Sequence, residues 1–216
     1  MPGRSAALPA AGVEAGTTRV SRIAVYGYAS LASRASAAQT LGRPVEFAAV
    51  ARLEGWARAW TLGREQAASE KTFARADGSV PRFCLGLNLD PDPEAPAPNG
   101  VLIELTDAEL DRLDLREKRY DRVDVTESIS FDHGAAPADP FDRVIAYTAK
   151  PRHHHPTPPE DAVIVATYPA AVEAAFDALG PGQLELFRAT TARPPAPLVE
   201  GRLVRDEIPP GNPRAW

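Results

Sequence analysis

The chain has 216 residues, of which 44% are hydrophobic and 25% are charged, values typical of a globular protein of one domain with appended segments. The formal net charge of −5, with lysines and arginines spread along the chain, argues against a nucleic-acid partner. No apolar run of about 18 residues predicts a membrane-spanning helix, and the single cysteine, Cys84, excludes an intrachain disulfide. We therefore expect a reducing, cytoplasmic setting and no membrane partner.

The N-terminal half of the chain predicts a tail followed by strands and a helix. Residues 1–20 are rich in Ala, Gly, Pro and Thr without periodicity, so we predict a flexible N-terminal tail. The folded domain is predicted over residues 21–192. It begins with an apolar strand over 23–28 that runs into a turn of small residues, and a helix over 34–41 follows. Residues 45–62 predict one bent strand or a hairpin with Gly55 at its middle, and residues 83–89 predict another strand.

The middle of the chain has a clear helix start. Residues 90–100 carry four prolines and end in Asn-Gly, which predicts a surface loop before a strand over 101–105. Thr106 and Glu109 have the spacing of a capping box, so a helix is predicted from Thr106 to residue 115 or 116. The alternation over 121–129 predicts a strand immediately afterwards.

The C-terminal part predicts a strand over 143–148 and helices over 168–179 and 183–190. Residues 193–216 are Pro-rich and are predicted to form a C-terminal tail packed on or near the domain. His153, His154 and His155 are adjacent, and adjacent side chains do not converge on one metal ion without a special turn. We therefore predict no metal site.

Two segments far apart in the sequence are candidates for a functional site. Residues 25–31 read VYGYASL, a strand end followed by a turn whose small residues let the backbone approach a ligand and whose N–H groups can hold an anion or oxyanion. Residues 113–125 read LDLREKRYDRVDV, where a helix stops, a strand begins and Glu117 lies at the junction. Each has an ordinary explanation on its own, a tight turn or a solvated charge cluster. The functional interpretation is that Glu117 points inward at the strand end.

Together these segments resemble the γ-glutamylcyclotransferase-like superfamily. The first is similar to its FGYGSL loop, the second to its LDxREgxYxRxxV segment, and residues 53–60, LEGWARAW, to its v-Gy-R-f strand. The likeness covers about residues 22–190, and Leu31 directly after Ser30 resembles the cation-transport-regulator-like branch most. The resemblance implies an α+β fold, a mixed β-barrel with flanking helices.

The resemblance also implies a reaction and a set of site residues. The reaction is intramolecular aminolysis of a γ-glutamyl amide, either a metabolite such as glutathione or a γ-glutamyl-protected biosynthetic intermediate, which releases 5-oxoproline and a free amine. It calls for no cofactor and no covalent intermediate. Glu117 matches the catalytic acid/base. The residues that match positions binding the γ-glutamyl group or lining its pocket are Tyr28, Ala29, Ser30, Leu31, Tyr147 and Tyr168.

Two departures from the family pattern leave alternatives open. Ile164 and Val165 replace the Pro and Ser of the PSxxY motif that ends at Tyr168. Ala29 stands where the family usually has glycine, and if that position needs a positive φ, alanine is strained there by about 1 kcal/mol or more. The strain would impair or retune the site. A non-catalytic binding or regulatory module on the same fold, or a related reaction on an amino acid in the same pocket, are the alternatives. The leaving amine and the oligomeric state are left open.

Overall fold

The computed structural model describes residues 21–132, 134–208 and 211–213, so the predicted N-terminal tail lies outside the described residues. A six-stranded sheet forms one side of the fold, in the order β7 (Tyr120–Asp124), β9 (Arg143–Ala149), β1 (Ile23–Gly27), β6 (Asn99–Leu105), β2 (Ala49–Leu53) and β8 (Ile129–Ser130). A four-stranded sheet follows the order β11 (Leu198–Val199), β10 (Ala162–Val165), β5 (Phe83–Pro91) and β3 (Trp56–Glu65). A two-stranded ribbon pairs β12 (Arg202–Asp206) with β4 (Lys71–Ala74).

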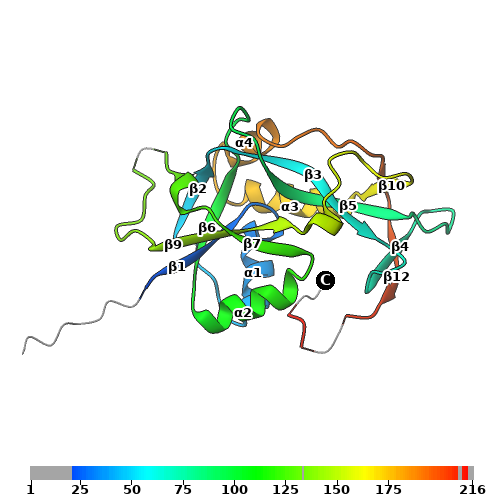
Figure 1. Ribbon diagram of the computed structural model, residues 1–216, viewed down its shortest axis with the longest axis horizontal. Helices are drawn as coiled ribbons and strands as arrows, with labels where there is room; N and C mark the ends of the chain where they lie inside the picture. The colour runs from blue at the N-terminus through cyan, green and yellow to red at the C-terminus, as the bar shows by residue number, and fades with distance from the viewer. Residues whose placement is uncertain (1–20, 133, 209–210, 214–216) are drawn as a thin grey trace, which may run out of the picture.

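The larger sheets are mixed and curl towards each other as an open barrel (Figure 1). β1 pairs antiparallel with β6 and parallel with β9, and β5 pairs antiparallel with β3 and parallel with β10. The two sheets meet where β5 passes β9, and there the Asn88 side chain accepts a 2.7 Å hydrogen bond from the Ala149 N–H. This arrangement confirms the predicted α+β fold class.

Four α-helices among the described residues flank the strands (Figure 1). α1 (Arg34–Leu41) packs against α2 (Asp107–Arg116), and α3 (Thr167–Asp177) packs against α4 (Gln183–Ala189). The predicted capping box of α2 is present: the Thr106 side chain accepts from the Glu109 N–H, and the Glu109 carboxylate accepts from the Thr106 N–H. No helix in the described ranges is long and apolar enough to cross a membrane.

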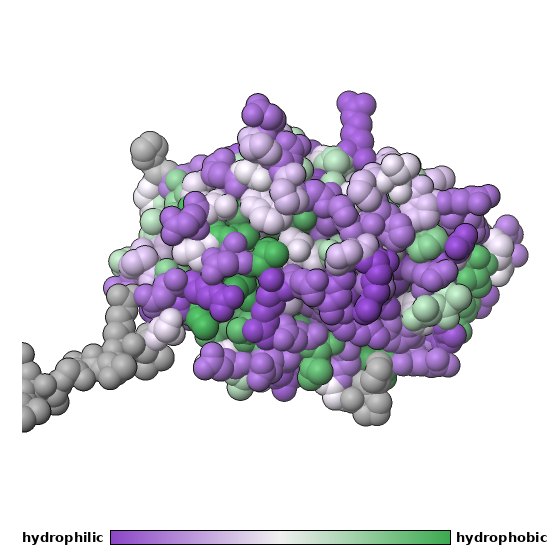
Figure 2. Space-filling model, in the orientation of Figure 1, coloured by the Kyte–Doolittle hydropathy of each residue, from purple (hydrophilic) through white to green (hydrophobic). Residues whose placement is uncertain are grey.

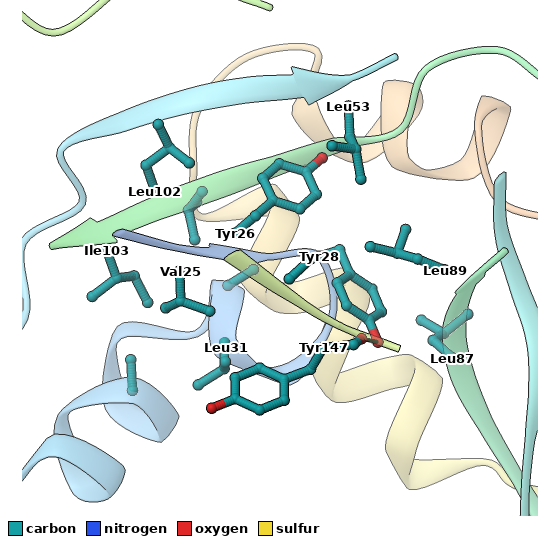
Figure 3. Close-up of a cluster of buried hydrophobic side chains, with 14 of the residues drawn as sticks. Val25, Tyr26, Tyr28, Leu31, Leu53, Leu87, Leu89, Leu102, Ile103 and Tyr147 are labelled. Carbon is teal, nitrogen blue, oxygen red and sulfur yellow. Dashed lines mark hydrogen bonds between the residues drawn. The ribbon is translucent and has the colours of Figure 1, made fainter. Parts of the chain in front are cut away.

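The main buried cluster joins side chains of the sheets with side chains of the helices packed on them. Figure 3 shows Val25 and Tyr26 of β1 together with Leu102 of β6 and Leu87 and Leu89 of β5, all almost completely buried. Successive side chains of a strand point to opposite faces, and Val25 and Tyr26 extend to opposite sides of β1 in Figure 3, so this strand buries apolar surface on both faces. The outer face seen in Figure 2 is mainly hydrophilic.

Three expectations about strands need correction. Residues 45–62 form neither a hairpin nor one bent strand, because β2 and β3 belong to different sheets and Gly55, with φ of 80°, turns the chain between them. The predicted loop 90–100 ends early, because Asn99 and Gly100 are buried in β6 opposite Arg52 and Ala51. The predicted strand over 121–129 is interrupted by a 3₁₀ turn over Thr126–Ser128 between β7 and β8.

The C-terminal segment takes part in the sheets. β11 pairs in parallel with β10, and β12 pairs antiparallel with β4. Beyond β12, the Asn212 side chain donates a 2.9 Å hydrogen bond to the Leu115 carbonyl of α2. The strands β4, β10, β11 and β12 were not expected from the sequence. The division of the chain into a domain over 21–192 and a tail over 193–216 stays a prediction.

Candidate active site

The turn after β1 brings backbone N–H groups to one end of the barrel. Tyr28 and Ala29 lead into a short 3₁₀ helix, η1 (Ser30–Ala32). Gly27 leaves little room in this tight turn, since a Cβ there would lie 3.0 Å from the Cβ of Leu31 and 3.1 Å from Cγ2 of Val101. The N–H groups at the start of a helix have no partners within it, and no hydrogen bond from the Ser30 or Leu31 N–H occurs within the described residues.

Glu117 is placed by the end of α2. Its N–H donates to the Leu113 carbonyl at 2.7 Å, and its carbonyl accepts from the Tyr120 N–H at 2.7 Å, so the chain reverses there from α2 into β7. The Glu117 side chain is 13% exposed, and its Oε1 lies 2.9 Å from Nε of Arg116. A nearly buried carboxylate is thereby fixed at the helix-to-strand junction.

Arg116 connects this carboxylate to the turn. Its guanidinium is buried and donates to the Ser30 hydroxyl at 2.8 Å, to the Ser36 hydroxyl at 3.0 Å and to the Thr40 hydroxyl. A planar fork of five donors suits such a set of acceptors, whereas a lysine would reach only part of it. Arg116 therefore holds η1, α1 and Glu117 in one arrangement, a role that the sequence interpretation did not assign.

Two tyrosine hydroxyls meet at Leu87 of β5. The Leu87 N–H donates to Oη of Tyr168 at 3.4 Å, and the Tyr120 hydroxyl donates to the Leu87 carbonyl at 3.2 Å. The Tyr168 ring also packs edge-on against Trp60, with ring centroids 6.1 Å apart. Burial raises the pKa of Tyr168 to about 12, so its hydroxyl is neutral at physiological pH.

Tyr28 and Tyr147 are linked through one hydrogen bond. The Tyr28 hydroxyl donates to the Tyr147 carbonyl at 2.8 Å, which Figure 3 shows as the point where the two residues meet. Burial raises the pKa of Tyr28 well above its usual value. The Tyr147 side chain points away from Tyr28 (Figure 3), and its hydroxyl donates to Asp114 of α2 at 2.7 Å. The hydrogen bond between the Tyr28 hydroxyl and the Tyr147 carbonyl thus ties the turn to β9.

The predicted site residues come together around a small pocket of about 40 Å³. Its lining includes every one of them, namely Tyr28, Ala29, Ser30, Leu31, Glu117, Tyr147 and Tyr168. A larger cavity of about 330 Å³ shares Ser30, Glu117, Tyr120 and Tyr168 with this pocket, so the two are neighbouring parts of one site. The predicted site residues therefore lie close together in space, and the role of each one stays a prediction.

The expectation about Ala29 is wrong in its premise. Ala29 has φ of −142°, which lies outside the left-handed region that favours glycine, and in the described part of the chain only Asp161 is a non-glycine residue with positive φ. The methyl group is therefore not strained in the way that the sequence comparison suggested. Ala29 gives no reason to regard the site as impaired.

The histidine run has three separate structural roles. His153 accepts from Arg152 at 3.1 Å, His154 lies 2.9 Å from Asp90, and the His155 ring packs against Phe83. Nowhere in the described ranges do three His, Cys, Asp or Glu side chains gather as metal ligands would.

The arrangement supports proton transfer beside an oxyanion. A carboxylate held at the pocket wall can accept and return a proton, and the N–H groups of η1 can stabilise negative charge on an oxygen. Tyr168 and Tyr120 add hydroxyl groups beside the carboxylate, and apolar side chains line much of the larger cavity. A substrate with a carbonyl group and an ionisable amine would use each of these features.

Comparisons with known proteins bear on the fold. No protein-family model and no curated protein sequence matches the chain. Among solved structures, the chain is similar to a γ-glutamyl cyclotransferase, with a TM-score of 0.52 and 14% identity over 80% of this chain and 89% of that one. It is also similar to an uncharacterized Homo sapiens protein, with a TM-score of 0.56 and 15% identity over 81% of this chain and 90% of that one. The chain therefore has the γ-glutamyl cyclotransferase fold, as its two motifs predicted.

Proposed function

We propose that the protein is an enzyme of the γ-glutamylcyclotransferase type, which converts a γ-glutamyl amide into 5-oxoproline and a free amine. The observation that carries this proposal is the pocket that Glu117 shares with the turn over residues 28–31, two segments that lie far apart in the sequence. The fold of a solved γ-glutamyl cyclotransferase supports it. The same fold can host other functions, so the site carries the argument rather than the fold.

In the proposed reaction the substrate attacks itself. The α-amine of the γ-glutamyl group forms a bond to its own γ-carbonyl carbon, which closes a five-membered ring, and the original amide C–N bond then breaks. Glu117 takes a proton from the attacking ammonium and returns one to the departing nitrogen. Ring closure has a large proximity advantage once the substrate is folded with its amine facing the carbonyl, so no covalent nucleophile is needed.

The other groups of the site position the reacting atoms. The N–H groups of Ser30 and Leu31 face the carbonyl oxygen as it gains negative charge, and a missing donor of this kind typically costs about 10²–10³ in turnover. Arg116 fixes the Glu117 carboxylate relative to Ser30. The chain supplies these groups without a cofactor, and its single cysteine favours a cytoplasmic location for the reaction.

Glu117→Gln tests the catalytic assignment. Glutamine keeps the shape and most hydrogen bonding but cannot move the proton, so we expect a folded variant that loses turnover by about 10²-fold or more. The measurement is 5-oxoproline release from a panel of γ-glutamyl compounds, with melting temperature on the same preparation. Asp111→Asn is the matched control, because it neutralises a carboxylate of the adjoining helix that is 85% exposed.

The alternative result is equally clear. If Glu117 serves only as an ion-pair partner of Arg116, the variant melts lower but releases 5-oxoproline normally per folded molecule. A stable Glu117→Gln protein with unchanged release would refute the catalytic role. If purified wild-type protein binds γ-glutamyl compounds but releases no 5-oxoproline, the non-catalytic alternative is correct.

A further inference from the structure

In the large cavity next to Glu117, the wall remote from Glu117 is formed by strands β3, β4 and β12 rather than by the turn and α2. Arg64 of β3, Lys71 and Phe73 of β4 and Leu203 of β12 line it, whereas Ser30 and Glu117 lie at the end shared with the small pocket. At about 330 Å³ the cavity is within the size range of sites for small molecules. A group attached to the γ-carbonyl would extend from Glu117 towards the β4–β12 ribbon.

The side walls of this cavity are mainly apolar. Leu62 and Leu85 line it from the paired strands β3 and β5, and Val165, Phe73 and Leu203 line it near the ribbon. Burying apolar surface against such walls is favourable, so they select an apolar body rather than a small polar one. Glycine-sized amines would leave most of the space to water.

The far end is positively charged. Lys71 is 2% exposed, and its Nζ lies 3.6 Å from Oδ2 of Asp206, a half-exposed carboxylate of β12. The Arg64 guanidinium lies 5.4 Å from the Phe73 ring centroid. Glu117 is the only acidic residue among the described residues that line the cavity, and it pairs with Arg116 at the other end.

We propose that this cavity binds the leaving amine, and that this amine carries a bulky apolar body with an anionic group at the end remote from the scissile bond. Arg64 and Lys71 are the anion-recognising residues, and Leu203 is a specificity-determining wall. The inference rests on the proposed function, because it names the substrate class of the same site. It also gives the C-terminal segment a role, since β12 supplies both Leu203 and the Asp206 carboxylate that competes for Lys71.

Two synthetic amides test the anion. One is the γ-glutamyl amide of 4-(aminomethyl)benzoate, and the other is the same compound with a carboxamide in place of the carboxylate. A charge-assisted contact in a buried site predicts that wild type prefers the acid in kcat/KM by about tenfold or more. The γ-glutamyl amides of benzylamine and glycine complete the set, and both are expected to be poorer than the acid because each lacks one of the two features.

Three variants assign the preference to residues. Arg64→Gln is expected to reduce the acid-to-carboxamide ratio towards one, and Arg82→Gln, which removes a guanidinium also 5.4 Å from a phenylalanine ring but outside this cavity, should leave it unchanged. Asp206→Asn removes the competing carboxylate of Lys71 and should increase the ratio. Each outcome is a change in the ratio of kcat/KM values for the acid and the carboxamide, so a general loss of activity would not produce it.

A pair of neighbours on β12 tests the apolar wall. Leu203→Ser should raise KM for both benzoate-derived amides by several-fold, whereas Val204→Ser, next along the strand and not lining the cavity, should not. Equal kcat/KM for all four amides, or an acid preference that survives Arg64→Gln, would overturn this inference and leave the proposed function standing. If no compound yields 5-oxoproline, the proposed function fails, and calorimetry then tests whether the cavity binds the acid amide. Absence of binding to wild type, or equal binding to wild type and Arg64→Gln, overturns the inference as well.

Discussion

Arg116→Gln is the variant that most directly probes how the site is held together. The wild-type Arg116 side chain is 8% exposed, and its guanidinium pairs with Glu117 and donates to the hydroxyls of Ser30, Ser36 and Thr40. Glutamine is too short to reach this set and carries no charge. The substitution therefore leaves the Glu117 carboxylate nearly buried without its cation.

The magnitude follows from that loss. Removing one partner of a buried ion pair costs about 3–5 kcal/mol, and the 13% exposure of Glu117 places this case near the lower end, at about 3 kcal/mol. For a protein of this size each kcal/mol lowers the melting temperature by about 2–4 °C, so we expect a fall of about 6–12 °C. Turnover per folded molecule should fall by about tenfold or more, because the carboxylate is no longer fixed relative to the turn.

The assay combines denaturant unfolding with 5-oxoproline release from one preparation. Arg112→Gln is the matched control: it lies one turn earlier on α2, is exposed, and donates a single 3.0 Å hydrogen bond to the Thr40 carbonyl, so its loss should cost about 1 kcal/mol or less. If Arg116→Gln unfolds at the same denaturant concentration as Arg112→Gln, the reasoning about the buried network is refuted. If stability falls while turnover per folded molecule is unchanged, Arg116 does not position Glu117.

Two further predictions concern the turn and a second buried carboxylate. Gly27→Ala should lower both melting temperature and turnover, since the new Cβ lies 3.0 Å from the Leu31 Cβ. Ala29→Gly should cost only about 0.5–1 kcal/mol of unfolding free energy and keep turnover. A larger loss of melting temperature and turnover in Ala29→Gly than in Gly27→Ala would contradict the geometry of the turn. For Glu70, burial acts to raise the pKa, but hydrogen bonds from Arg119 and Lys118 outweigh it and lower the pKa from 4.5 to about 2. Because the folded-state pKa is the lower one, the stabilisation is complete above about pH 4.5 and is lost as the pH falls towards 2. Glu70→Gln should therefore melt well below wild type at pH 7, and the gap should narrow between pH 4.5 and 2; a constant gap in melting scans would show that the charge of Glu70 does not matter.

The parts of the fold that the sequence predicted correctly depend on local interactions. The helix α1 has the predicted bounds Arg34–Leu41, and α2 begins at its capping box because Thr106 and Glu109 are three residues apart. The path of the chain around Gly55 depends on which strands pair over long separations, which a local pattern does not specify. The same holds for β12, because its partner β4 lies far earlier in the chain and is too short to show a clear strand pattern.

The site shows the same division between local and distant information. Glu117 is recognisable because a whole segment surrounds it, but Arg116, Lys118 and Arg119 look alike in the sequence. In the structure Arg116 faces the turn, Arg119 pairs with the buried Glu70, and Lys118 is 43% exposed. One signal was present: Arg116 lies three residues after Leu113, on the apolar face of α2, so a charged residue there must be buried with partners.

The difference between Gly27 and Ala29 shows why a departure from a family motif needs a structural reason before it is read as loss of function. A glycine can be required by a positive φ or by the space that a Cβ would fill, and a motif does not say which applies. Here Ala29 does not meet the first requirement, because its φ is −142°, whereas Gly27 meets the second through Leu31 and Val101. The alanine was the main sequence argument for a non-catalytic module, and it no longer supports that alternative. The choice between enzyme and binding module therefore depends on Glu117, which pairs with Arg116 beside the turn and whose role Glu117→Gln tests.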